Sequence, residues 1–168
     1  LLDDMANWGD PKYVMGEVDI FKIFKDYELF GAMNINYLKL EDVPEYGDGW
    51  QPVLDALRAG QFFVTTGEVL ITNCTFNGKE SGETLSKKSL KKVRLNTSLE
   101  WTYPLSHLEV VSGDGNKIYR QRIDLSDTSE FRSKDIQVNL DLSKRTWARI
   151  EVWDIAKNGA FTQPVWID

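Results

Sequence analysis

The chain has 168 residues, of which 42% are hydrophobic and 27% are charged, a composition that is typical of a globular domain and far from that of a disordered chain. A chain of this length buries roughly 70% of its unfolded surface, so it needs no disulfide or metal to fold. Its 26 acidic and 20 basic side chains give a formal net charge of -6, which disfavours nucleic acid and anionic membranes as partners.

Cysteine content and hydropathy exclude several kinds of site and a membrane span. Cys74 is the single cysteine, which excludes an internal disulfide, a cysteine-rich zinc site and a paired redox motif. No apolar stretch approaches the length of a membrane span, and the first residues carry neither an initiator methionine nor a basic signal region. We therefore expect no membrane partner, and we expect the chain to be a processed or excised part of a larger protein. The sequence does not indicate its cellular compartment.

The first 50 residues have a mixed pattern. Residues 18–30 fit helical and extended templates almost equally, and we predict a helix there. Residues 33–40 alternate as in a strand, and residues 44–49 contain the proline and glycines of a loop. We assign residues 1–50 to an N-terminal segment and residues 51–168 to the main domain.

A short helix is predicted after this loop. Pro52 suits a first helical turn, Val53, Leu54 and Leu57 follow at helical spacing, and Gly60 can take the residue after the helix end. The sequence therefore predicts one short helix before the strands begin.

From residue 62 onward, β-branched and aromatic runs alternate with turn signals. The runs occupy residues 62–66, 69–76, 93–101, 108–112, 117–123, 136–142, 146–154 and 165–167. In the clearest run, 93–101, the odd-numbered residues are mostly apolar and the even-numbered ones polar. Asn77-Gly78 and the Asp-Gly pair at 114–115 are typical hairpin turns. The pattern predicts a mainly β, immunoglobulin-like antiparallel β-sandwich of about seven or eight strands.

Two stretches carry a more specific signal. They are DALRAGQFFVTTGE at 55–68 and the end of the chain, from WARIEV at 147–152 to AFTQPVWI at 160–167. Both resemble the C-terminal domain of CehA/McbA-like proteins, a branch of the PHP (polymerase and histidinol phosphatase) metal-dependent hydrolases, although Gln163 stands where the resemblance leads us to expect Asn. Looser matches at FNG (76–78) and LEVVSG (108–113) extend the resemblance over about residues 50–168.

The resemblance implies an accessory β-sandwich that follows a PHP barrel, with residues 1–50 as the end of that barrel or its linker. In the family the metal ions and the catalytic residues belong to the barrel. We therefore expect no catalytic residue and no cofactor in this chain, and divalent metal ions only in the barrel.

Isolated reactive side chains have simpler structural interpretations. His107 is the only imidazole, and a hydrolytic metal site needs several converging ligands, so we interpret His107 as a surface or structural residue. We interpret Cys74 as a small buried hydrophobe. Asp114 and Asn116 are explained by the hairpin turn.

Two charged clusters are also interpreted as solvated surface. The acidic cluster at the N-terminus matches no calcium-binding loop; its members are Asp3, Asp4, Asp10, Glu17 and Asp19. The basic run lies among serines and glycines, which is typical of an exposed loop; its members are Lys79, Lys87, Lys88, Lys91 and Lys92.

The most informative constellation is aromatic. In the run 146–154, Ala148, Ile150 and Val152 suit the core, which places the intervening side chains together on the opposite face. With a contribution from the last strand, the candidate ligand or interdomain face consists of Trp147, Arg149, Glu151, Trp153 and Trp166. Such a face suits a sugar ring, or it packs against the barrel, against residues 1–50 or into the core. We favour interdomain packing.

These observations predict a non-catalytic accessory domain that docks in cis on a PHP-type barrel and stabilises it or shapes its entrance. The alternative is a free-standing carbohydrate-binding sandwich that uses the tryptophan face. An enzyme built on two carboxylates ranks last, because nothing in the sequence singles out a pair.

Overall fold

The computed structural model describes residues 2–10, 12–18, 33–47 and 49–168. These residues form two α-helices, α1 (Leu2–Asn7) and α2 (Gln51–Arg58), a 3-10 helix η2 (Lys87–Lys92) and eleven strands. The strands are β1 (Ile35–Leu38), β2 (Phe62–Thr65), β3 (Val69–Phe76), β4 (Thr84–Leu85), β5 (Val93–Trp101), β6 (Leu105–Gly113), β7 (Ile118–Asp124), β8 (Arg132–Leu140), β9 (Trp147–Asp154), β10 (Gly159–Thr162) and β11 (Val165–Ile167). The mainly β prediction is confirmed, with more strands among these residues than the seven or eight expected, and helix α1 was not predicted.

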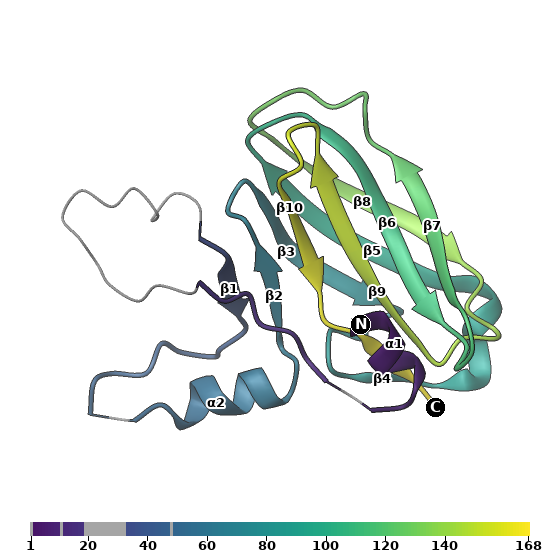
Figure 1. Cartoon of the computed structure of the whole chain (residues 1–168), viewed down its shortest axis with the longest axis horizontal. Helices are drawn as coiled ribbons and strands as arrows, with labels where there is room; N and C mark the ends of the chain where they lie inside the picture. The colour runs from purple at the N-terminus through teal and green to yellow at the C-terminus, as the bar shows by residue number, and fades with distance from the viewer. Residues whose placement is uncertain (1, 11, 19–32, 48) are drawn as a thin grey trace.

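The strands form the two layers of a sandwich (Figure 1). The larger layer, sheet A, has the order β1-β2-β10-β9-β6-β7, while β11 pairs with one end of β9 and carries β4 beside it. The smaller layer, sheet B, has the order β3-β5-β8. All neighbours are antiparallel except β4 and β11. Among the strands of sheet A, the edge strand β3 contacts β10 most and β2 less, so β1 and part of β2 lie beyond the edge of sheet B.

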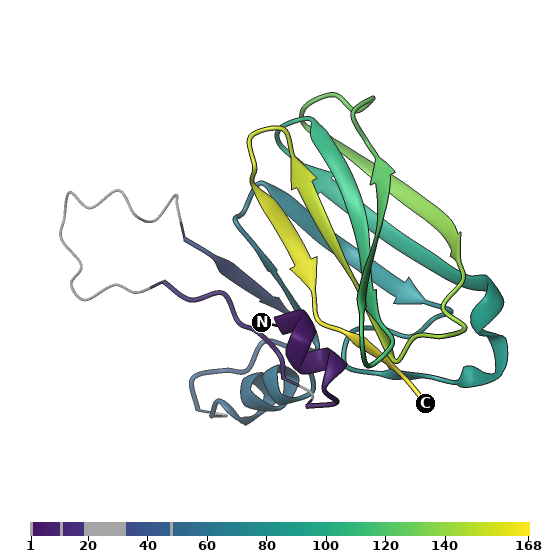
Figure 2. The same cartoon turned by 45° about the vertical axis from the view of Figure 1, so that its right-hand side comes forward.

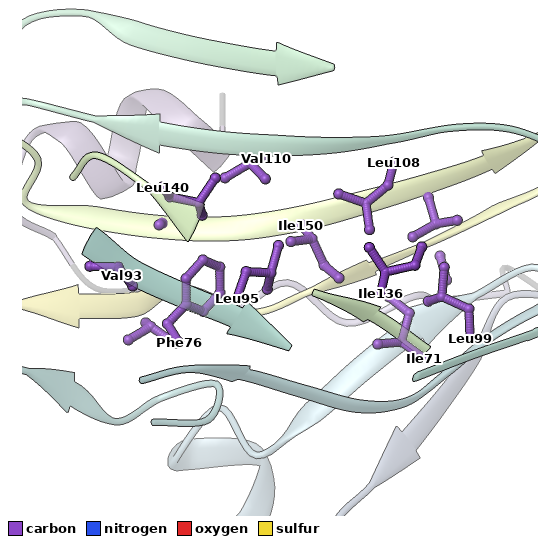
Figure 3. Packing of buried hydrophobic residues seen from close by; sticks show 14 of the residues in the cluster. Ile71, Phe76, Val93, Leu95, Leu99, Leu108, Val110, Ile136, Leu140 and Ile150 are labelled. Atoms are coloured by element: carbon purple, nitrogen blue, oxygen red, sulfur yellow. The ribbon is translucent and has the colours of Figure 1, made fainter. Parts of the chain in front are cut away.

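The core lies between the two sheets (Figure 3). It packs side chains of β5, such as Leu95 and Leu99, against Leu108 of β6 and Ile150 of β9. Every odd-numbered residue of β5 is buried, whereas Arg94 and its even-numbered companions are exposed or half-buried, which confirms the predicted alternation. Each fully buried Leu, Ile or Val side chain stabilises the fold by roughly 1.5 to 3 kcal/mol.

Both predicted hairpin turns are present. Asn77 and Gly78 have φ angles of 49° and 81°, the left-handed conformation that a two-residue turn between β3 and the following chain requires. In the turn between β6 and β7, the Asp114 carboxylate accepts the backbone N–H groups of Asn116 and Lys117, both at 2.8 Å. A hydrogen bond from the Tyr119 hydroxyl, together with these two bonds, lowers the pKa of Asp114 to about 2.

The N-terminal segment is part of the same sheet as the main domain. The strand predicted to end near Leu40 is β1, which pairs with β2 across the expected boundary between residues 50 and 51. The predicted helix after the loop is α2, followed by Gly60 at φ 71°. The helix predicted at 18–30 lies outside the described residues apart from Val18. No helix in the described part of the chain has the length and hydrophobicity to cross a bilayer.

Candidate functional site

The predicted division of β9 into two faces is observed. Ala148, Ile150 and Val152 belong to the main core. Trp147 and Arg149 lie on the opposite, outer face of sheet A, and they are buried there as well. A second layer therefore covers this face.

Helix α1 is that second layer over Trp147. In Figure 2 the helix lies against the outer face of sheet A, and Ala6 packs with Trp147 and Val111 in a second, smaller apolar cluster. The indole Nε1 of Trp147 donates to Oδ1 of Asn7 at 3.1 Å, and the ring is 0% exposed. Gly113 makes this fit possible, because a Cβ there would overlap both the Asn7 side chain and the Trp147 ring. Trp147 thus presents no surface to a ligand.

Arg149 is held by carboxylates from both the sheet and the helix. Its Nε and Nη2 donate to Oδ1 of Asp3 at 2.9 and 2.8 Å, and Nη2 also donates to Glu151 at 2.5 Å. Arg120 from β7 joins the same carboxylates and adds Glu109 at 2.5 Å. Nη1 of Arg149 is buried and has no hydrogen-bond partner among the described residues. The network therefore couples α1 to three strands.

Charge compensation dominates the electrostatics of this network. Burial works to raise the pKa of Glu151, but the adjacent Arg149 and Arg120 outweigh it, so the pKa lies below its usual range. Burial works to lower the pKa of Arg120, and the neighbouring carboxylates, Glu109 foremost, raise it overall. The arrangement keeps Glu151 ionised, which suits an ion-pair network better than an acid–base pair.

The other two tryptophans are half-buried by separate contacts. The Trp153 ring lies over Gly159, where a Cβ would overlap it, and its Nε1 donates to Glu151 at 3.3 Å. Trp166 donates to the Tyr13 hydroxyl at 3.2 Å. The five predicted residues therefore share one side of the sheet without forming one open aromatic surface. Their role toward a ligand or another domain stays a prediction.

Residues 12–17, which we name the N-terminal strap, continue the cover across sheet A toward β1 (Figure 1). The fully buried Gln163 accepts from the Val14 N–H at 3.0 Å and donates to the Val14 carbonyl at 2.9 Å. Asn36 makes the same pair of bonds with Gly16 at 2.9 and 2.8 Å. Two side-chain amides thus fasten the strap as a neighbouring strand would.

A separate concave surface lies where β1 and β2 pass the edge strand β3. We name it the β1–β3 groove. It has a volume of about 440 Å³, and the side chains that matter most are Tyr37, Lys39, Gln61, Phe63, Asn73 and Glu80. Tyr37 and Phe63 stack with ring centres 5.0 Å apart and planes 6° apart. The sequence pattern did not indicate this groove, because its residues come from segments that are distant along the chain.

The single histidine and the single cysteine occupy structural positions. His107 is half-buried on β6 beside Ser106, and burial and the nearby Arg122 lower its pKa. Cys74 is half-buried on β3, where burial raises the pKa of the thiol to about 12 against a smaller opposing effect of the Thr97 hydrogen bond. A neutral thiol of this kind is a poor nucleophile.

The acidic cluster is dispersed, and Asp3 does not lie on the solvated surface that was expected. Asp3 is buried in the α1 network, whereas Asp10 pairs with Lys12 at 3.3 Å on the surface, and Asp19 lies outside the described residues. Within the described ranges no three His, Cys, Asp or Glu side chains could hold a metal ion together. Four of the lysines lie on η2, a 3-10 helix where a loop was expected, and all four are exposed: Lys87, Lys88, Lys91 and Lys92.

Comparison with known proteins gives no relative. No family model matches the chain, and neither the curated proteins nor the solved structures include a significant match.

Proposed function

We propose that this chain is a non-catalytic accessory domain that docks in cis on the catalytic barrel of a PHP-type metal-dependent hydrolase and shapes its entrance. The proposal rests on the resemblance of residues 55–68 and 147–167 to such domains and on one structural observation. That observation is an uneven distribution of exposed apolar side chains.

Exposed large apolar side chains gather in the N-terminal third of the chain. Nine of the fourteen found among the described residues lie before residue 55. Four of these nine lie on α2 or in the loop before it: Val43 at 87%, Tyr46 fully exposed, Trp50 at 74% and Leu54 at 41%. We name these four residues the docking surface. Contiguous exposed apolar patches usually mark an interface.

Helix α2 itself supports this interpretation. Val53, Leu54 and Leu57 follow the helical spacing of an apolar face, yet Ala56 is the only residue of the helix that is buried. An eight-residue helix is marginal without tertiary packing. In Figure 2 the helix stands beside the sandwich and not on it, so a further packing partner is expected there.

If the chain docks through α2, the tryptophan face has a structural role and is not the docking site. Trp147 is sealed by α1, and Trp166 is engaged by Tyr13, so a sugar platform built from these rings is the less favoured function. The ion-pair network on that face fastens the N-terminal segment to the sandwich. The chain leading into the domain would then be held in a fixed orientation relative to it.

The test compares two double variants of the longer protein that carries these residues. Trp50→Ser with Leu54→Ser alters the docking surface, and Phe131→Ser with Ile155→Ser alters exposed apolar residues elsewhere. We expect the first pair to split thermal unfolding into two transitions and to increase proteolysis between the domains, while the second pair changes neither. Equal behaviour of the two pairs would contradict the proposal.

A further inference from the structure

The β1–β3 groove has an aromatic floor that the fold leaves open. Because β1 and β2 extend past the edge strand of sheet B, Tyr37 is 43% exposed although its ring stacks on Phe63. Tyr37 and Phe63 are partners across β1 and β2, and their stacking holds the Tyr37 ring in place. The ring therefore loses little further freedom when a ligand binds. The Tyr37 ring, with Phe63 packed against one of its faces, is therefore a preorganised flat apolar surface.

Free polar groups surround this floor. The side-chain amides of Gln61 and Asn73 line the groove, and neither has a hydrogen-bond partner in the described part of the chain. Each amide offers two donor hydrogens and an acceptor oxygen. The groove thus combines an apolar floor with unused donors and acceptors at its rim.

The net charge of the groove is zero. Lys39 and Glu80 are paired at 2.5 Å, and the other lining residues are uncharged. A charged ligand would have to compete with this pair, whereas a neutral ligand with hydroxyl groups could bond to both members. Electrostatics therefore favours an uncharged ligand.

We propose that the β1–β3 groove binds a neutral carbohydrate, with one pyranose ring stacked on Tyr37, which Phe63 backs, and its hydroxyls bonded to Gln61, Asn73 and the Lys39–Glu80 pair. A pyranose has one flat apolar face and a polar rim, which matches the floor and the rim of the groove. The volume of about 440 Å³ lies within the usual range for small-ligand sites. A simple planar aromatic compound would leave the rim unsatisfied, and an acidic sugar would meet Glu80.

The experiment titrates the 168-residue chain with neutral hexasaccharides of xylose, glucose, mannose and galactose and follows the amide resonances by NMR. Hexagalacturonate and p-nitrophenol serve as the charged and the purely aromatic probes. We expect at least one neutral hexasaccharide to shift the side-chain amides of Gln61 and Asn73 at concentrations up to about 10 mM. Tyr37→Ala should weaken that binding at least about tenfold.

The control is Tyr103→Ala, which removes an equally exposed tyrosine outside the groove and should leave the affinity unchanged. Absence of shifts with all four neutral sugars, binding that survives Tyr37→Ala, or a response to p-nitrophenol or hexagalacturonate alone would each overturn the proposal. The outcome is independent of the docking proposal, since it uses the isolated chain and none of the four docking-surface residues.

Discussion

Removal of the Asp3 carboxylate is the sharpest perturbation of the outer face of sheet A. Asp3→Ala deletes two charge-assisted hydrogen bonds to Arg149 and one to Arg120, at 2.8 to 2.9 Å. The side chains of Asp3 and Arg149 are only 12% and 5% exposed, so solvent cannot replace these bonds without moving α1.

The expected loss of unfolding free energy depends on the partner that Arg149 keeps in the variant. Loss of one partner from a buried ion pair costs about 3 to 5 kcal/mol, but Glu151 still neutralises Arg149 in the variant. We therefore expect the low end, about 3 kcal/mol of unfolding free energy. For a chain of this size, that corresponds to a fall in Tm of about 6 to 12 °C.

The assay is urea unfolding of the 168-residue chain, with the free energy taken by linear extrapolation. Asp10→Ala is the matched control, because it removes a surface pair with Lys12 whose side chains are more than half exposed, and it should cost less than about 1 kcal/mol. If Asp3→Ala were no more destabilising than Asp10→Ala, α1 would not be docked through Arg149 and the account of this face would be wrong.

Two further predictions concern the close approach of Gly82 to Ala59 and the stability of the chain at low pH. Gly82 has φ 82°, and a Cβ there would overlap the Ala59 carbonyl, so Gly82→Ala should lower the free energy of unfolding in urea by at least about 3 kcal/mol. The control is Gly78→Ala, where φ is 81° and the space is open, and it should cost about 1 kcal/mol. Equal costs of the two variants would refute the close approach of Gly82 to Ala59. Folding lowers the pKa of Asp114 to about 2 and also lowers the pKa of Glu151. Both carboxylates therefore stabilise the folded state at pH values above their unfolded pKa values, and this stability is lost as the pH falls through their pKa values in the folded state. The urea midpoint should therefore fall between about pH 4 and pH 2, and less steeply in Asp114→Asn; identical slopes in the variant and the parent chain would count against the Asp114 turn.

Local sequence patterns predicted the parts of the fold that local physics determines. The alternation in β5 identified its buried face because one face of this strand meets the core and the other meets solvent. The same argument separated Ile150 from Arg149 on β9, although both proved to be buried. Hydrophobic alternation distinguishes the core side of a strand, but it does not show whether another segment covers the far side.

The features that escaped prediction depend on long-range contacts or on very short elements. Strand β4 has two residues, too few for a periodic signal, and it exists because β11 lies beside it. Helix α1 is a single short helical segment, stabilised by Asp3 and Asn7 against strands more than a hundred residues later. The β1–β3 groove arises because sheet A is wider than sheet B, a property of strand order that local patterns do not reveal.

The central proposal is that another domain covers the docking surface, whereas α1 of the chain itself covers Trp147. Hydroxyl-radical footprinting of the 168-residue chain and of the longer protein tests both halves in one measurement. We predict that Tyr46 and Trp50 are oxidised rapidly in the isolated chain and protected in the longer protein, that Trp147 is protected in both, and that Phe131 is oxidised equally in both. Equal oxidation of Trp50 in the two proteins, or rapid oxidation of Trp147 in the isolated chain, would contradict the account.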